Sequence, residues 1–101
     1  MNKKPEIIIN IYDYAGSFAE NKDVARTIRE KYLFPALKEG KHVILDYSKV
    51  DSTTQSFTHA LISSAIKNFK EDFFNIVSFK SCTETVRDII GIVTEYMQKH
   101  I

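Results

Sequence analysis

The chain has 101 residues, of which 44% are hydrophobic and 27% are charged, and its 14 basic residues nearly balance its 13 acidic ones. This length suits one domain with a single core, and the composition is that of a globular protein rather than a disordered or fibrous one. The formal net charge of +1 excludes a chain-wide attraction to nucleic acid or anionic lipid, so we expect neither as a partner.

The sequence predicts no targeting, membrane or metal-binding segment. The apolar run at 7–9 is far shorter than a signal-peptide core, and no stretch reaches the roughly 20 apolar residues of a membrane span. Cys82 is the single cysteine, which excludes an internal disulfide and any multi-cysteine metal site, and the three histidines lack ligand spacing. We therefore expect a single cytoplasmic domain over residues 1–101, with no metal and no cofactor.

The first predicted element is a buried strand over residues 6–12, a β-branched apolar run that is closed by a turn at Gly16. The alternation of a strand puts Tyr12 and Tyr14 on one face. With Tyr47 they bring three aromatic rings to the same end of the sheet, where they could form a recognition surface. Packing in the core or at its rim is the alternative role for all three.

Apolar residues at helical spacing predict a helix over about 18–39, which Gly40 terminates. The helix has two rival starts, a capping box at 17–20 and Asn21. Pro35 interrupts the pattern, so we expect a kink or break at the residue before it.

The clearest strand is predicted at 41–47, where residues 43–45 are too apolar to face water on either side, so this strand should be central in the sheet. A polar stretch follows at 48–56. A second helix then ends near 69–71, and its core-facing stripe comprises Phe57, Leu61, Ile62, Ala65, Ile66 and Phe69.

The last predicted strand covers residues 74–79 and should lie nearer the sheet edge, because apolar and polar residues alternate at its ends. Residues 81–84 have the spacing of a capping box. They precede a long amphipathic helix with apolar positions Val86, Ile89, Ile90, Val93 and Met97.

The order strand-helix-strand-helix-strand-helix predicts an α/β fold with a mostly parallel or mixed sheet in two or three layers. Ligands and partners of open parallel sheets usually meet the loops at the carboxyl ends of the strands. Three segments qualify as such loops, at 13–17, 46–56 and 80–84.

The loop at 46–56 is the most unusual of the three, because it places four hydroxyls immediately before a helix. Capping the helix requires one of them, so the surplus favours a phosphorylation site or an anion site at the positive end of the helix dipole. A polar loop with a redundant cap is the alternative. The candidates for partner or anion binding are Asp51, Ser52, Thr53, Thr54, Gln55 and Ser56.

Other chemistry is weakly supported. Asp46 and Asp51 could bind magnesium, but Asp46 is more simply a strand-end residue that receives N–H groups of its loop. His59 could act as a general base, although its spacing points it away from the apolar stripe and predicts a solvated histidine. Cys82 could be activated by a helix dipole, but no base adjoins it in sequence. No nucleophile, base and orienting group occur together, so we expect no enzymatic activity.

The segment 42–50, followed by Ser56, Phe57 and an apolar helix, resembles the STAS domains, named for sulfate transporters and anti-sigma-factor antagonists. The resemblance is closer to their STAS-like relatives of unassigned function. The STAS pattern is an apolar strand ending in Asp, a short loop with Val or Leu, and Asp-Ser-Ser-Gly-Leu opening a helix. Gly16 resembles the glycine that follows the first strand of such domains, so the likeness extends over most of the chain.

Measured from Val50, this resemblance puts Thr54 at the family's aspartate, Gln55 at its first serine and Ser56 at its second. The second serine is the phosphoacceptor of anti-sigma-factor antagonists, which a partner kinase switches. Ser56 is therefore the implied phosphoacceptor. Phe57 replaces the family's glycine and the preceding acid is lost, so the usual kinase substrate site is not preserved.

The resemblance implies a non-enzymatic regulatory module that docks a protein partner through the 48–58 loop and the second helix, with Ser56 as a candidate phosphoswitch. A kinase-like ATP-binding regulator is one candidate partner. The alternative is a small-molecule or nucleotide-binding domain that holds a phosphate at the same helix start.

Overall fold

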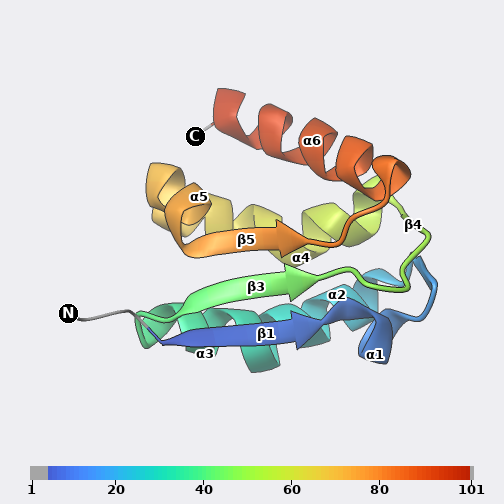
Figure 1. Cartoon of the computed structure of the whole chain (residues 1–101). Coiled ribbons are helices and arrows are strands. Elements are labelled where there is room, and N and C mark those ends of the chain that lie inside the picture. Colours follow the sequence, from blue (N-terminus) through green and yellow to red (C-terminus); the bar gives the residue numbers. More distant parts are fainter. Residues whose placement is uncertain (1–4, 101) are drawn as a thin grey trace.

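Three runs of mainly apolar residues pair in parallel to form the main sheet of the computed structural model, which describes residues 5–100 (Figure 1). The strand order β1-β3-β5 confirms that β3 is central. A second, two-residue parallel pairing joins β2 to β4. The strands are β1 (Glu6–Asn10), β2 (Phe18–Ala19), β3 (His42–Asp46), β4 (Ser52–Thr53) and β5 (Val77–Lys80).

Helices connect the strands and confirm the predicted strand-helix alternation. The first crossover is one helical rod in which a π-helical turn, η1 (Arg29–Leu33), joins α2 to α3. The 3-10 turn η2 (Lys70–Asp72) follows α4. The α-helices are α1 (Ile11–Ala15), α2 (Lys22–Ile28), α3 (Phe34–Lys38), α4 (Gln55–Phe69), α5 (Phe73–Ile76) and α6 (Glu84–Lys99). None of the helices in the described range has the length and apolar content that crossing a lipid bilayer requires.

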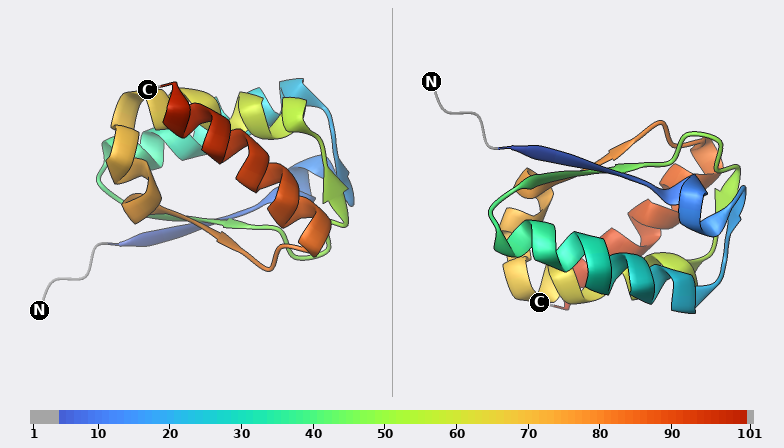
Figure 2. Two further views of the ribbon diagram at one scale, coloured as in Figure 1. Left: turned by 90° about the horizontal axis from the view of Figure 1, so that it is seen from above. Right: turned by 90° about the horizontal axis from the view of Figure 1, so that it is seen from below.

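The helices cover one face of the sheet, so the domain has two layers (Figure 2). Val43 and Leu45 of β3 are buried against them, whereas Ile44 is half-buried on the opposite face beside Ile8, which is 52% exposed. The expectation that residues 43–45 are covered on both sides is therefore wrong. Both crossovers return over the same face, and no described element covers the other.

The first strand is shorter than predicted. Its pairing with β3 ends at Asn10 opposite Asp46, because the chain after β3 turns away and leaves residues 11 onward without a partner strand. They form α1 instead, so Tyr12 and Tyr14 do not share a strand face. The ring of Tyr14 packs on Tyr32 at 5.2 Å between centroids, while Tyr47 is fully buried. The predicted cluster of three tyrosines is thus not formed.

The first long helix starts at its second predicted cap. The Asn21 side chain accepts the backbone N–H groups of Asp23 and Val24 at 2.8 and 3.3 Å. The capping box at 17–20 is wrong, because Phe18–Ala19 pairs with β4 and so cannot begin the helix.

The helix continues through Pro35, but its regular α-helical hydrogen bonding is interrupted just before the proline, near the expected break. The widened turn η1 precedes it, and the Phe34 N–H bonds the Arg29 carbonyl five residues back. A π-helical turn accommodates a position where a proline lacks its N–H and crowds the preceding turn. The end of the helix is as predicted: Gly40 has φ +76°, and the N–H groups of Gly40 and Lys41 bond carbonyls of α3 at 3.1 and 3.0 Å, as in a Schellman motif.

The last strand, β5, begins later than predicted, because residues 73–76 form α5 and only Val77–Lys80 joins the sheet. Phe73 is buried and packs edge-to-face on Phe74, which a helical turn permits and strand alternation would not. The capping box at 81–84 is also displaced, since Thr83 caps α6 by accepting the Val86 N–H at 3.1 Å.

One continuous core joins the sheet to the helices. The predicted stripe of α4 is confirmed, with Phe57, Leu61, Ile62, Ala65 and Ile66 all fully buried. Tyr47, at the end of β3, is the largest fully buried side chain, and its hydroxyl has no hydrogen-bond partner within residues 5–100. Burial raises the pKa of the Tyr47 phenol far above its ordinary value.

Tyr47→Phe should not lower the free energy of unfolding at neutral pH and should raise it by up to about 1 kcal/mol, because it removes a buried, unpaired hydroxyl. Above pH about 10 the unfolded phenol ionises while the buried one stays protonated. Tyr47 therefore makes the free energy of unfolding of the wild type fall by up to about 1.4 kcal/mol per pH unit in this range. The variant has no phenol at this position and lacks that decrease. Urea titrations at neutral and alkaline pH measure both effects. Equal slopes with pH would contradict burial of the phenol.

Candidate functional site

The three loops predicted at the carboxyl end of the sheet do lie there, and they are bonded to one another (Figure 1). The Asp51 N–H donates to the Ser17 carbonyl at 2.8 Å, and the Thr83 hydroxyl donates to the Asp51 carbonyl at 3.0 Å. The Tyr47 N–H donates to the Lys80 carbonyl at 2.9 Å. The segment that leads into α4 is therefore held from both sides.

The hydroxyls of this segment are divided between structural roles and exposure. Thr53 is buried and donates to the Ala19 carbonyl at 2.8 Å, which ties β4 to β2. Thr54 is the N-cap of α4, and its hydroxyl accepts the Phe57 N–H at 3.1 Å. Ser52 is half-buried within β4.

Asp51, Gln55 and Ser56 present exposed side chains at this end of α4. Ser56 lies in the first helical turn, and its hydroxyl makes no hydrogen bond to any other residue that the structure describes. The cap is already supplied by Thr54, so Ser56 has no capping role. Of the candidate hydroxyls, Ser56 is thus the one that combines exposure with freedom from a structural bond.

Asp46 has the structural role that its position suggested. Its carboxylate accepts the Ser48 N–H at 2.9 Å and the Ser48 hydroxyl at 2.6 Å. These bonds to Ser48 hold the pKa of the Asp46 carboxyl below its ordinary value. Within residues 5–100, no group of three or more His, Cys, Asp or Glu side chains is arranged to hold a metal ion.

Cys82 and His59 belong to different elements, the loop after β5 and helix α4. Cys82 is half-buried just before the Thr83 cap, and burial raises the pKa of its thiol, which disfavours a reactive thiolate. His59 is exposed on the side of α4 away from the core stripe, as predicted.

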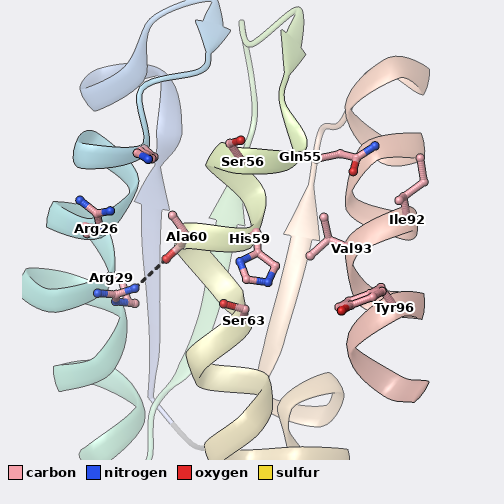
Figure 3. Close-up of a pocket in the computed structure, with 11 residues that line it drawn as sticks. Arg26, Arg29, Gln55, Ser56, His59, Ala60, Ser63, Ile92, Val93 and Tyr96 are labelled. Carbon is pink, nitrogen blue, oxygen red and sulfur yellow. Dashed lines mark hydrogen bonds between the residues drawn. The ribbon is translucent and has the colours of Figure 1, made fainter. Parts of the chain in front are cut away.

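A groove of about 630 Å³ runs along the outer side of α4 and was not predicted (Figure 3). One wall is basic and comes from α2 and η1, with Lys22, Arg26 and Arg29. The floor belongs to α4 and includes Ser56 and His59. The opposite wall is apolar and comes from α6, with Ile92, Val93 and Tyr96.

The basic residues of this groove do show a pattern in the sequence, since positions 22, 26 and 29 share one side of a helix. That pattern is also typical of an ordinary solvated face. Only the packing of α2 and α6 on either side of α4 brings the basic and apolar walls together.

The family model described as a STAS-like domain of unknown function (DUF4325) matches residues 24–87, well over half of the chain. The match includes β3, the whole 48–58 loop, α4 and β5. No curated protein and no solved structure matches the chain significantly.

Thr54→Ala should lower the free energy of unfolding by about 1 kcal/mol, because it leaves the first turn of α4 without its side-chain cap. Ser56→Ala, two residues later, should change it by less than about 0.5 kcal/mol, because no structural bond is lost. Urea denaturation followed by circular dichroism compares the two. Equal losses would contradict the division of roles between these hydroxyls.

Proposed function

Because the chain belongs to the STAS-like domains of unknown function, we propose that it is a non-enzymatic regulatory module that docks a partner protein through the 48–58 loop and α4. One observation carries the proposal. Ser56, which stands at the phosphoacceptor position of the resemblance to anti-sigma-factor antagonists, has an exposed hydroxyl that is free of structural bonds.

The surroundings of Ser56 support a recognition surface. Gln55 and Ser56 project from the start of a helix that is fixed beneath by Phe57 and capped by Thr54. A surface on a rigid element loses little conformational entropy when a partner binds. Binding residues are often held in this way, by loops and helix starts on a stable scaffold.

The same surroundings support phosphorylation of Ser56 as the switch. The hydroxyl is accessible, and its modification would break no bond that the fold needs. A phosphate in the first turn of α4 would be favoured by the helix dipole and would add roughly −1.5 to −2 charge to the docking surface. A kinase-like ATP-binding regulator would combine the partner and the modifying enzyme in one protein.

Ser56→Asp should weaken capture of the partner from native lysate, whereas Ser56→Ala should retain it. Ser78→Asp is a matched control with the same charge change, because Ser78 is exposed on β5 beside Ile44, on the face of the sheet that the helices leave uncovered. Quantitative mass spectrometry of the captured proteins measures the difference. Equal capture by Ser56→Asp and Ser56→Ala would rule out the switch.

A small-molecule or nucleotide ligand is the second candidate function. It is favoured by the volume of the groove beside Ser56, about 630 Å³, which falls within the range of roughly 300–1,000 Å³ that ligand pockets occupy. Such a ligand would place its phosphate at the start of α4.

A nucleotide that binds in this way should raise the melting temperature. At 100 times its Kd a ligand stabilises the folded state by about 2.7 kcal/mol, which a thermal-shift assay detects readily. A panel of nucleotides at millimolar concentration tests this, with Arg26→Glu as the variant that should lose the shift. The absence of any shift would count against the second candidate and leave the docking proposal untouched.

A further inference from the structure

The groove beside α4 has a charge that the chain as a whole lacks. Three of the 11 lining residues are Lys or Arg, and none is Asp or Glu, although the chain contains nearly equal numbers of acids and bases. Arg26, Arg29 and the floor lie within the matched residues 24–87, whereas Lys22 and the α6 wall lie outside them.

The basic wall is a row with helical spacing. Lys22, Arg26 and Arg29 are four and three residues apart, so they lie on one side of the rod and extend over roughly 10 Å. Arg29 is held in place, since its guanidinium donates to the Ala60 carbonyl at 3.0 Å and pairs with Glu30 at 2.8 Å.

The other two cations remain available to a partner. Arg26 pairs with Asp23 at 2.6 Å, but both side chains are at least half exposed, and such surface pairs exchange partners easily. Lys22 is exposed and makes no ion pair within residues 5–100.

The opposite wall offers unpartnered apolar surface. Ile92 and Tyr96 of α6 are 47% and 54% exposed, and they are one helical turn apart on the side that faces the groove (Figure 3). An amphipathic helix whose apolar side chains stay this exposed has not buried all of the surface it could.

The floor between these walls carries mainly small or polar side chains. Ser56, Ala60 and Ser63 are small, so the backbone of another helix could come close to α4 along the row that these three residues form, beside the larger His59. Ser63 is only 8% exposed and faces the groove, and its hydroxyl makes no hydrogen bond to another described residue. This hydroxyl is therefore available to a polar group that the ligand brings.

We propose that this groove binds an amphipathic helix of the partner protein that carries acidic side chains along one side and apolar side chains along the other. The inference rests on the proposed docking function and names its partner chemistry. Acidic side chains spaced three and four residues apart would pair with Lys22 and Arg26, while the apolar side would cover Ile92 and Tyr96.

This binding mode gives Ser56 a mechanism as a switch. Ser56 lines the same groove as Lys22 and Arg26, so a phosphate on its hydroxyl would attract these cations within the chain. The phosphate would thereby occupy the basic wall and repel the acidic side of the partner helix.

A synthetic helical peptide tests the proposal without knowledge of the natural partner. The probe carries Glu at positions one turn apart on one side and Leu and Phe on the other, and its matched control has Lys in place of each Glu. Fluorescence anisotropy measures binding, and amide chemical shifts locate it. The Glu peptide should bind with shifts centred on Arg26, Ser63 and Tyr96, and higher salt should weaken it.

Charge and apolar variants of the protein sharpen this test. The double variant Lys22→Glu, Arg26→Glu should bind the Glu peptide about tenfold or more weakly than the wild type, and it should bind the Lys peptide more tightly. Lys38→Glu, an exposed charge reversal on α3, should do neither. Ile92→Ser should weaken binding, whereas Ile8→Ser, at a similarly exposed position on the open sheet face, should not.

Equal binding of both peptides, or shifts elsewhere than the groove, would overturn the proposal. So would self-association through the groove, or saturation of it by inorganic phosphate alone. If capture from lysate responds to Ser56→Asp but not to the double charge reversal, docking is correct and the groove chemistry is wrong. If capture responds to neither, the docking function itself fails.

Discussion

The peptide groups on either side of Asp51 determine how the functional end of this domain is built. The Asp51 N–H donates to the Ser17 carbonyl, and the Asp51 carbonyl accepts the Thr83 hydroxyl. Ser17 and Thr83 belong to the loops that follow β1 and β5 of the main sheet. Each strand therefore contributes through its own loop to the fixed position of the segment that begins α4. The importance of Asp51 lies in its backbone, while its carboxylate remains exposed to solvent. Because the loops are bonded to one another, the start of α4 is not free to move independently of the sheet.

The two-layer arrangement follows from crossovers that return over the same face of the sheet (Figure 2). It places α4 in the middle of the helical layer, in contact with α2 on one side and α6 on the other. One side of α4 is consequently committed to the core through Phe57 and Leu61. The opposite side becomes the floor of a groove whose walls are the neighbouring helices. The uncovered face of the sheet, with Ile8 and Ile44, lies away from this surface.

The sequence predicts those elements whose pattern is long enough to be decided locally. The position of the central strand and the buried stripe of α4 agree with the structure because their apolar patterns are local, and the helix end at Gly40 agrees because a glycine cap is a local signal. The wrong predictions lie where a segment that is distant in the sequence decides the local structure. Whether residues 11–15 extend the strand depends on the turn after Asp46, and Phe18 joins a strand only because Ser52 pairs with it.

The site shows the same division between local and distant causes. The candidate segment at 51–56 could be proposed from the sequence, since a polar run before an apolar helix is a local signal. The separate roles of Thr53 and Thr54 could not, because the hydroxyl of Thr53 is taken by Ala19, 34 residues earlier in the chain. The groove likewise combines residues of three helices, and no single segment carries its mixed character.

The departures from the STAS pattern can be understood through these contacts. Thr54 stands where that pattern has aspartate, and both residue types are good N-caps, so the helix start is retained while a negative charge is lost. Phe57 stands in place of a glycine and is fully buried, which anchors the first turn in the core. Both changes preserve the platform beneath Ser56, and the one at Thr54 also removes a negative charge from the surface that a partner meets. The start of α4 is consequently less negative than that pattern implies, which agrees with the acidic partner proposed above.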